Sequence, residues 1–306
     1  PPRSTLFPYT TLFRSAFDEV VSSPSLFVYL LLLMALIFVI LLGGVKGGIE
    51  RLARVLMPSL VVMLLALMTF VLTLDNALAG VRYYLIPDFS KLNGSVINSA
   101  LSHAFFSLSL GMGILITYGS YFSKRDNIAS ATRLVAVADT GIAFFAGMLI
   151  IPAIFVFDPG TNTEDLSTSS VSLIFSFLPK IFVLMQATFG YVGASVFATL
   201  FFTLVFFAAL TSLVSIIEIP IAYLIDEWGF SRKKAVTFQA AALLLLVTPA
   251  TMSLGMSESL TAFTNYAGVS KSVFDVISDV FYETILPFGG FLVCMFCAYR
   301  DRKSVV

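Results

Sequence analysis

Long apolar runs separated by short polar stretches dominate the chain. A helix needs about 20 mostly apolar residues to cross a bilayer, and runs of roughly this kind occupy residues 26–42, 55–74, 96–122, 134–157, 192–225, 235–254 and 275–298. These seven runs predict membrane-spanning helices. A further apolar segment at about 165–188 contains Pro179 and Lys180 and overlaps a loop rich in Ser and Thr, so extracellular loop helices are expected there instead of a span.

The third run carries unusual residues at its midpoint. Ser107, Ser109, Gly111 and Gly113 fall within seven residues, although glycine costs roughly 1 kcal/mol in a helix interior and serine competes for backbone hydrogen bonds. We therefore expect the helix to open there. An opened backbone is tolerated in hydrocarbon only where protein buries it or a polar cavity solvates it. It would then face a bound ion or solute; the alternative is that small residues merely allow close helix packing.

Composition fits a membrane protein. Hydrophobic residues make up 58% of the chain, charged residues only 12%, and the mean hydropathy is +0.96, whereas soluble domains carry about a quarter charged residues. Basic residues are scattered between apolar runs and form no patch for nucleic acid. The prediction is an all-α, multi-pass protein of the cell's inner (plasma) membrane, with the lipid bilayer as a partner and no nucleic acid.

The loops predict the orientation, because cytoplasmic loops are enriched in Lys and Arg. One alternating set of loops and ends carries 10 such residues and the other carries 4. The first set is expected inside, which places the loop with Asp158, Glu164 and Asp165 outside.

Both ends read as non-native. Residues 5–15, TLFPYTTLFRS, match the translation of a sequencing adapter, and residues 301–306, DRKSVV, resemble its reverse complement. We expect a leader at 1–15, a transmembrane domain at 16–300 and a tail at 301–306.

Ionisable residues inside spans are costly and mark functional candidates. Asp139 needs a cation, a proton or a cluster of donors. Glu218 is expected to make a buried structural hydrogen bond. Asp275, Asp279 and Glu283 recur every four residues and so share one helical face, as a wetted helix end or as part of a gate.

A second group of oxygen atoms is expected in the fifth run. The carbonyl of Ala208 and the hydroxyls of Thr211 and Ser212, at i+3 and i+4, converge on one helix face. Hard oxygens of this kind suit an alkali cation. The alternative is that these hydroxyls bond back to their own helix.

Six motifs, in order along the chain, resemble those of the neurotransmitter:sodium symporter family, which includes bacterial sodium-dependent amino-acid transporters. They are GGVKGGIERLARVLMP (43–58), IPDFSKL (86–92), AFFSLSLGMGILITYGSY (104–121), Asp139-Thr140 with Ala146-Gly147, LIFSFLP (173–179) and FFAALTSLVSIIEIP (206–220). The resemblance implies a leucine-transporter-type fold of two inverted five-helix repeats. The chain would hold helices four to ten: the second repeat and the last two helices of the first. A piece of this extent is expected to be inactive alone.

The resemblance also implies residue roles. A substrate pocket would involve Phe106 as an aromatic lid, with Ser107, Ser109, Met112, Ser212 and Ile216. A first sodium site would use Ser107 and Asp139, and a second would use Ala208, Thr211 and Ser212, each site being only half present. Asp275 or Asp279 would be the acidic half of an outer gate. His103 replaces a glutamine that is common in the family, so the contact made there is open.

The resemblance implies sodium-coupled symport of an amino acid, neutral and apolar or aromatic, by alternating access. It implies no enzyme activity. A fixed carboxylate at Asp139, with Ala143 lacking a hydroxyl one turn on, predicts that no chloride is needed. The alternative is a transporter of the same fold that uses proton coupling, with Asp139 as the proton carrier, or carries another small organic solute. Neither the amino acid nor the oligomeric state can be read from the sequence.

Overall fold

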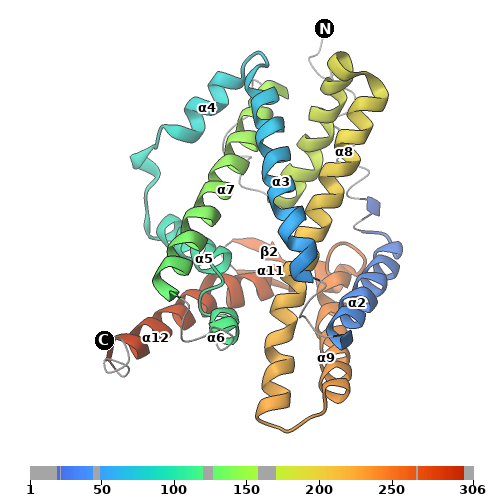
Figure 1. Cartoon of the computed structure of the whole chain (residues 1–306), viewed down its shortest axis with the longest axis vertical. Coiled ribbons are helices and arrows are strands. Elements are labelled where there is room, and N and C mark those ends of the chain that lie inside the picture. The colour runs from blue at the N-terminus through green and yellow to red at the C-terminus, as the bar shows by residue number, and fades with distance from the viewer. Residues whose placement is uncertain are drawn as a thin grey trace. The chain divides into compact units, whose positions relative to one another are not determined.

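The computed structural model describes residues 19–20, 22–43, 49–119, 127–157, 170–266 and 268–299, and most of them are helical (Figure 1). The predicted leader 1–15, the tail 301–306 and the acidic loop with Asp158, Glu164 and Asp165 lie outside the described residues. In chain order the elements are α2 (Ser25–Gly43), α3 (Ile49–Leu72), α4 (Ala77–Leu85), η2 (Phe89–Lys91), α5 (Gly94–Ser107), α6 (Ile114–Gly119), α7 (Ile128–Phe157), α8 (Ser170–Asp226), α9 (Arg232–Met252), α10 (Glu258–Thr261), β1 (Thr264–Tyr266), β2 (Val269–Lys271), α11 (Val273–Ile277), η4 (Ser278–Ile285) and α12 (Leu286–Tyr299).

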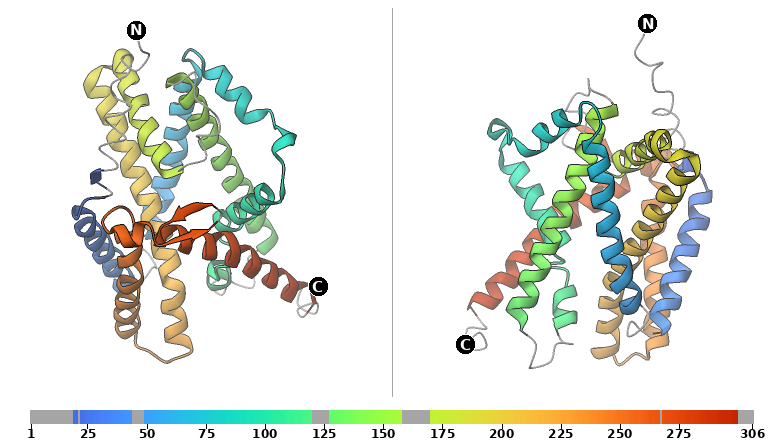
Figure 2. Two further views of the ribbon diagram at one scale, coloured as in Figure 1. Left: turned by 180° about the vertical axis from the view of Figure 1, so that it is seen from behind. Right: turned by 45° about the horizontal axis from the view of Figure 1, so that its top comes forward.

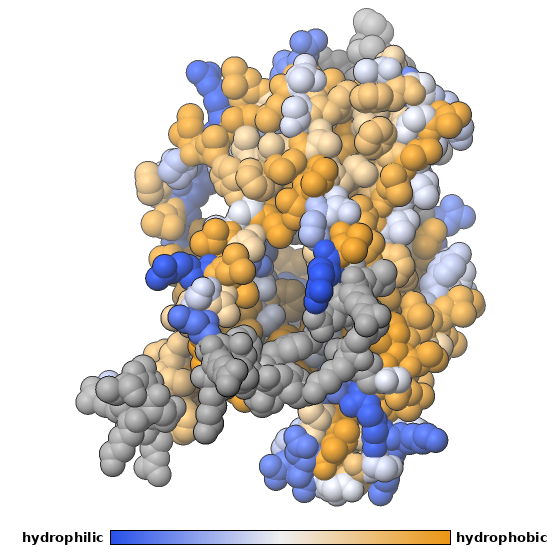
Figure 3. All heavy atoms as spheres, in the orientation of Figure 1, coloured by the Kyte–Doolittle hydropathy of each residue, from blue (hydrophilic) through white to orange (hydrophobic). Residues whose placement is uncertain are grey.

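Six helical stretches among the described residues are long and apolar enough to cross a membrane. At most 28% of the residues in any of their most apolar windows are buried, so most of this apolar surface faces outward. On the face drawn in Figure 3, hydrophobic residues cover most of the helices and hydrophilic ones gather at the turn between α8 and α9. An exposed apolar surface of this kind needs lipid around it, and the chain is a multi-pass membrane protein.

The third predicted span is divided in two. The run at 96–122 forms α5 and α6 with residues 108–113 unwound between them, and within the described residues neither half reaches spanning length. The predicted opening of this helix is confirmed.

Helix α8 contains a sharp turn at Gly190, whose φ of 71° and ψ of 170° are not helical. The part before Gly190 covers the described portion of the expected loop helices at 165–188, and the part after it begins the span expected at 192–225. Glycine tolerates the positive φ that this turn requires.

The chain divides into two compact units. Leaving out undescribed positions, the first unit includes residues 46–87 and 140–211, and the second unit comprises residues 24–45, 88–139 and 212–306. Helices α7 and α8 therefore contribute to both units.

The core of the first unit lies between α3, α7 and the early part of α8. Leu67, Val71, Leu149, Ala153 and Ile181 are each at most 1% exposed and belong to one hydrophobic cluster. Helix α4 packs beside it through small residues: a side chain at Gly80 would collide with the backbone of Pro152, and one at Gly147 with the ring of Tyr84.

The second unit contains the only strands among the described residues. β1 and β2 pair antiparallel, with Thr264 opposite Lys271, and this hairpin lies beside the start of the helix formed by α11, η4 and α12 (Figure 2). η4 is π-helical, a wider turn that often marks functional sites. Neither the hairpin nor the π-helical segment was predicted.

Glu218 takes part in an ion pair. Nη1 and Nη2 of Arg232 donate to its two carboxylate oxygens, each at 2.9 Å. Nε of the same guanidinium donates to the carbonyl of Leu41 at 2.8 Å. Arg232 thus joins the first turn of α9 to α8 and to the last turns of α2, and the structural role expected for Glu218 is confirmed.

Replacing Arg232 by Met is expected to lower the free energy of unfolding by about 1–3 kcal/mol, because the Glu218 carboxylate, with its side chain 13% exposed, loses two charge-assisted hydrogen bonds. Denaturant unfolding in detergent micelles measures the change. The neighbouring exposed residue supplies the control, since Lys233→Met should change stability by less than about 0.5 kcal/mol. Equal effects of the two substitutions would contradict a structural role for the ion pair.

Candidate functional site

The end of α5 is set by local backbone geometry. The amide of Leu110 donates to the carbonyl of Phe105 at 2.7 Å, and that of Ser109 donates to Phe106 at 3.0 Å. This pair of bonds, with Ser109 left-handed at φ 58°, is a Schellman motif. Glycine usually occupies the left-handed position, so a serine there holds strain of the kind found at functional sites.

Two glycines carry the chain through the rest of the opening. Gly111 and Gly113 have φ of 76° and 80°, values that favour glycine. A Cβ at Gly111 would lie 2.8 Å from the backbone nitrogen of Gly290 in α12. A Cβ at Gly113 would lie 3.5 Å from Cγ2 of Ile219 in α8. The unwound segment therefore lies against the backbone of α12 and a side chain of α8.

Ser107 and Asp139 meet beside this opening. The hydroxyl of Ser107, on the last turn of α5, donates to Oδ1 of Asp139 in α7 at 2.6 Å. The two residues are 32 positions apart in the sequence, and they bring a hydroxyl and a carboxylate from two helices to one point. A cation bound by both oxygen atoms would replace this hydrogen bond.

The candidate oxygens in α8 also lie together. The hydroxyl of Thr211 donates to the carbonyl of Ala208 at 2.8 Å. This is the bond within the helix that one alternative predicts, and the other alternative uses the same two oxygen atoms as cation ligands. Ser212 follows directly and is exposed, and Ile216, one turn further, is half-buried. Ile216 lies three residues before Ile219, which places it on the helix face that approaches Gly113.

The other predicted pocket residues lie at or next to the opening. Ser109 and Met112 are half-buried within it, and Phe106 is 46% exposed on the last turn of α5. The ring of Phe106 makes an edge contact with Tyr282 of η4, with centroids 5.3 Å apart.

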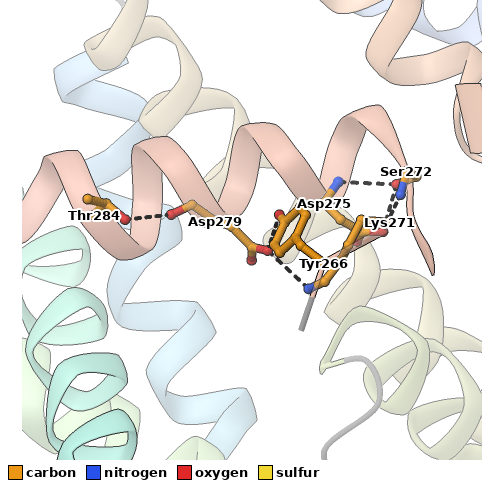
Figure 4. A network of polar contacts seen from close by, with 6 residues as sticks. All are labelled: Tyr266, Lys271, Ser272, Asp275, Asp279 and Thr284. Atoms are coloured by element: carbon orange, nitrogen blue, oxygen red, sulfur yellow. Dashed lines mark hydrogen bonds and ion pairs between the residues drawn. The ribbon is translucent and has the colours of Figure 1, made fainter. Parts of the chain in front are cut away.

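The acidic residues at the start of the last span have separate partners (Figure 4). Asp275 forms a capping box with Ser272, accepting from its amide at 2.9 Å and from its hydroxyl at 2.8 Å. Asp279 accepts a hydrogen bond from the hydroxyl of Tyr266 at 2.6 Å and pairs with Nζ of Lys271 at 3.0 Å. Asp279 thereby fixes the hairpin to η4.

The same contacts shift two ionisation equilibria in the hairpin. The hydrogen bond to Asp279 raises the pKa of Lys271 above its ordinary value, because the carboxylate stabilises the ammonium form. The hydrogen bond to Asp279 also raises the pKa of Tyr266. The carboxylate accepts a hydrogen bond from the neutral phenol, and its negative charge disfavours the phenolate form.

Sequence reasoning missed several of these partners. Lys271 counted only as a loop charge, and the Ala-Gly dipeptide at 267–268 between Tyr266 and Val269 is not one of the dipeptides that mark a hairpin turn in a sequence. No local pattern marks Tyr282 or Gly290, because their contacts come from segments about 180 residues away.

The family follows from comparison with known proteins. A family model described as the sodium:neurotransmitter symporter family matches residues 11–287. The chain belongs to this family. It also resembles the crystal structure of MhsT in complex with L-phenylalanine, with a TM-score of 0.82 and 34% identity over 96% of this chain and 65% of that one.

Relatives of this chain carry related names. The uncharacterized sodium-dependent transporter YhdH of Bacillus subtilis is 32% identical over 275 residues, which are 90% of this chain and 57% of that protein. An uncharacterized sodium-dependent transporter of Haemophilus influenzae is 34% identical over 81% of this chain and 50% of its own length. The human sodium- and chloride-dependent creatine transporter 1 is 31% identical over 49% of this chain and 23% of its own length. The chain spans about half the length of the curated bacterial relatives that it matches.

Gly111→Ala is expected to destabilise the protein by about 1–3 kcal/mol, because the new Cβ meets the backbone of α12 and φ is positive. Thermal unfolding in detergent measures the loss. Gly119→Ala is the matched control: nothing lies within 4 Å of its would-be Cβ, and alanine favours a helix. A loss for Gly119→Ala as large as for Gly111→Ala would contradict this account of the opening.

Lys271 is expected to react slowly with amine-modifying reagents just below the ordinary lysine pKa, because its raised pKa leaves less neutral amine. Asp279→Asn should accelerate its modification several-fold, while exposed Lys233 reacts equally in both proteins. Peptide mass spectrometry follows both sites. The bond to Asp279 should hold the hairpin at all lower pH values where Asp279 stays ionised, and weaken as the pH rises through the raised pKa of Lys271. Unchanged reactivity in Asp279→Asn would contradict the ion pair.

Proposed function

We propose that the full-length symporter couples the inward movement of Na⁺ to the uptake of a neutral, apolar or aromatic amino acid by alternating access. The observation that carries the proposal is the meeting of Ser107 and Asp139 at the opening of a membrane helix, with Oγ and Oδ1 2.6 Å apart. Family membership and the likeness to MhsT with L-phenylalanine support the same function.

The first sodium site is proposed at Ser107 and Asp139. A hydroxyl and a carboxylate are hard oxygen ligands, which suit an alkali cation better than a transition metal. A carboxylate in a membrane span is costly unless it meets a cation or donors, and Na⁺ would supply that partner. The remaining ligands would come from chain that the relatives have and this one lacks.

The second sodium site is proposed at Ala208, Thr211 and Ser212. The Thr211 hydroxyl and the Ala208 carbonyl already lie 2.8 Å apart. Turning the hydroxyl hydrogen away would present both oxygen atoms to a cation, with the Ser212 hydroxyl as a third ligand. This site would also be completed by other helices.

The proposed substrate pocket is formed by residues at the opening and on the facing side of α8: Phe106, Ser107, Ser109, Met112, Ser212 and Ile216. Methionine is flexible and polarisable, and together with Ile216 it would provide an adaptable apolar wall. These side chains favour an apolar or aromatic cargo.

Transport is proposed to need no chloride. The Asp139 carboxylate would supply a fixed negative charge beside the first sodium, and Ala143 offers no hydroxyl to a chloride one turn further along α7. The creatine transporters among the relatives are named chloride-dependent, so the family includes members of the other kind.

Asp279 is the better of the two candidates for an outer gate. Asp275 forms the capping box at the start of α11, so moving it would uncap that helix. Asp279 contacts only side chains, those of Tyr266 and Lys271, among the interactions described above, and another side chain could take their place. The proposed gate would exchange Lys271 for a basic residue from elsewhere in the full-length protein.

Sodium alone could drive such uptake. A tenfold gradient contributes about 1.4 kcal/mol, and one charge crossing about 100 mV contributes about 2.3 kcal/mol. Each Na⁺ therefore supplies roughly 3.7 kcal/mol, and proton coupling is not required.

The test is uptake of radiolabelled L-phenylalanine by the full-length protein in proteoliposomes, with and without a sodium gradient and chloride. Wild type is expected to need sodium and to ignore chloride. Asp139→Asn should lose about 10- to 100-fold in sodium affinity, the loss of one charge-assisted ligand, and chloride should restore part of it. Asp75→Asn, an exposed loop residue, is the matched control and should behave as wild type.

Two outcomes would change the proposal. Uptake that ignores sodium but follows a proton gradient would make Asp139 a proton carrier. Uptake of creatine or another small organic solute in place of any amino acid would keep the coupling but overturn the substrate class.

A further inference from the structure

The outer half of the opened helix, α5, touches η4 along one face. Ser99, His103 and Phe106 are spaced by four and three residues, so they share a side of the helix, and Asn98 lies next to Ser99. Each of them contacts Tyr282 or Glu283. Two adjacent residues of the π-helical segment, Tyr282 and Glu283, thus make all of these contacts with α5.

The backbone of η4 explains why this contact has a fixed register. Pro287 lies four residues after Glu283 and has no N–H, so it cannot donate the usual helical bond to the Glu283 carbonyl. Nδ2 of Asn98 donates to that carbonyl at 3.0 Å instead. The hydroxyl of Ser99 adds a bond to the Glu283 side chain at 3.3 Å. Displacing α5 along η4 would leave a backbone carbonyl without this donor in an apolar span.

Tyr282 is held in this register against two residues of α5. Its ring meets that of Phe106 at 5.3 Å and 70°, a favourable edge-on geometry. Its hydroxyl lies 3.5 Å from Nδ1 of His103, a distance at the long limit for a hydrogen bond. The ring contact is therefore the stronger of the two.

Phe106 depends on this neighbour for its orientation. Its side chain is 46% exposed, so general burial does not fix its rotamer. The next residue, Ser107, bonds to Asp139 on α7. The last turn of α5 is thus held at adjacent positions by two different helices, through Tyr282 on one side and Asp139 on the other.

We propose that Tyr282 is a positioning residue that holds Phe106 over the substrate and thereby slows substrate release. This inference rests on the proposed function, in which Phe106 covers a bound amino acid. Tyr282 does not touch the cation ligands, so it should act on the substrate and not on sodium.

A double-mutant cycle on the full-length protein tests the proposal, with dissociation of radiolabelled L-phenylalanine at saturating sodium as the readout. Tyr282→Ala should speed release about 2- to 12-fold, the range expected for losing one aromatic pair, and leave the sodium midpoint unchanged. Tyr282→Phe keeps the ring and should stay close to wild type. In a Phe106→Ala background, Tyr282→Ala should have no further effect.

Phe281→Ala is the matched control, because Phe281 precedes Tyr282 in η4 and its side chain is 59% exposed. Its release rate should match wild type. Additive effects of Tyr282→Ala and Phe106→Ala, or an equal effect of Phe281→Ala, would overturn the positioning role.

A second measurement needs no substrate and separates this inference from the proposed function. Amide hydrogen exchange over residues 104–110 should rise in Tyr282→Ala and not in Phe281→Ala. If wild type binds no amino acid, the proposed function fails on its own. Unchanged exchange in Tyr282→Ala overturns the positioning role whether or not an amino acid binds.

Discussion

The structure around the opened helix depends on one constraint: a backbone that unwinds inside an apolar span must find new partners for its polar groups. The bonds from Ser109 and Leu110 back to α5 satisfy part of this need. On the facing helix, Pro287 removes a donor and the side chain of Asn98 replaces it. The absence of a side chain at Gly111 lets its backbone approach that of α12, and the absence of one at Gly290 leaves room for the ring of Phe105, so the opening and α12 form one packed arrangement.

Polar side chains beside the opening supply the chemistry of the site. A hydroxyl and a carboxyl group meet there through Ser107 and Asp139, and oxygen atoms of this kind are the ligands that hard cations prefer. The bond from Ser107 to Asp139 therefore has two readings that do not conflict. It satisfies a carboxylate in the absence of a cation, and it keeps two oxygen atoms where a cation could join them.

The sequence predicted whatever depends on local pattern, namely the spans, the interruption of the third run and the positions of the oxygen-bearing residues. Glycine and serine at 107–113 break a helix through their own backbone preferences, so no distant contact is needed to see it. The partners of those residues were not predicted, because Tyr282, Gly290 and Lys271 acquire their roles through distant packing or hairpin pairing. Glu218 lies between these cases: its need for a partner was clear from its place in a span, but only the structure identifies that partner as Arg232.

Within the second unit, a continuous set of contacts runs from the hairpin to Ser107 and Asp139. Lys271 and Tyr266 hold Asp279 at one end of η4, Tyr282 in the same segment meets Phe106, and Phe106 precedes Ser107, which meets Asp139. η4 is π-helical, and π-helical turns are frequent at functional sites. In the proposed function, a rearrangement of η4 would move Phe106 and leave Ser107 held by α7, which would separate release of the substrate from release of the ion.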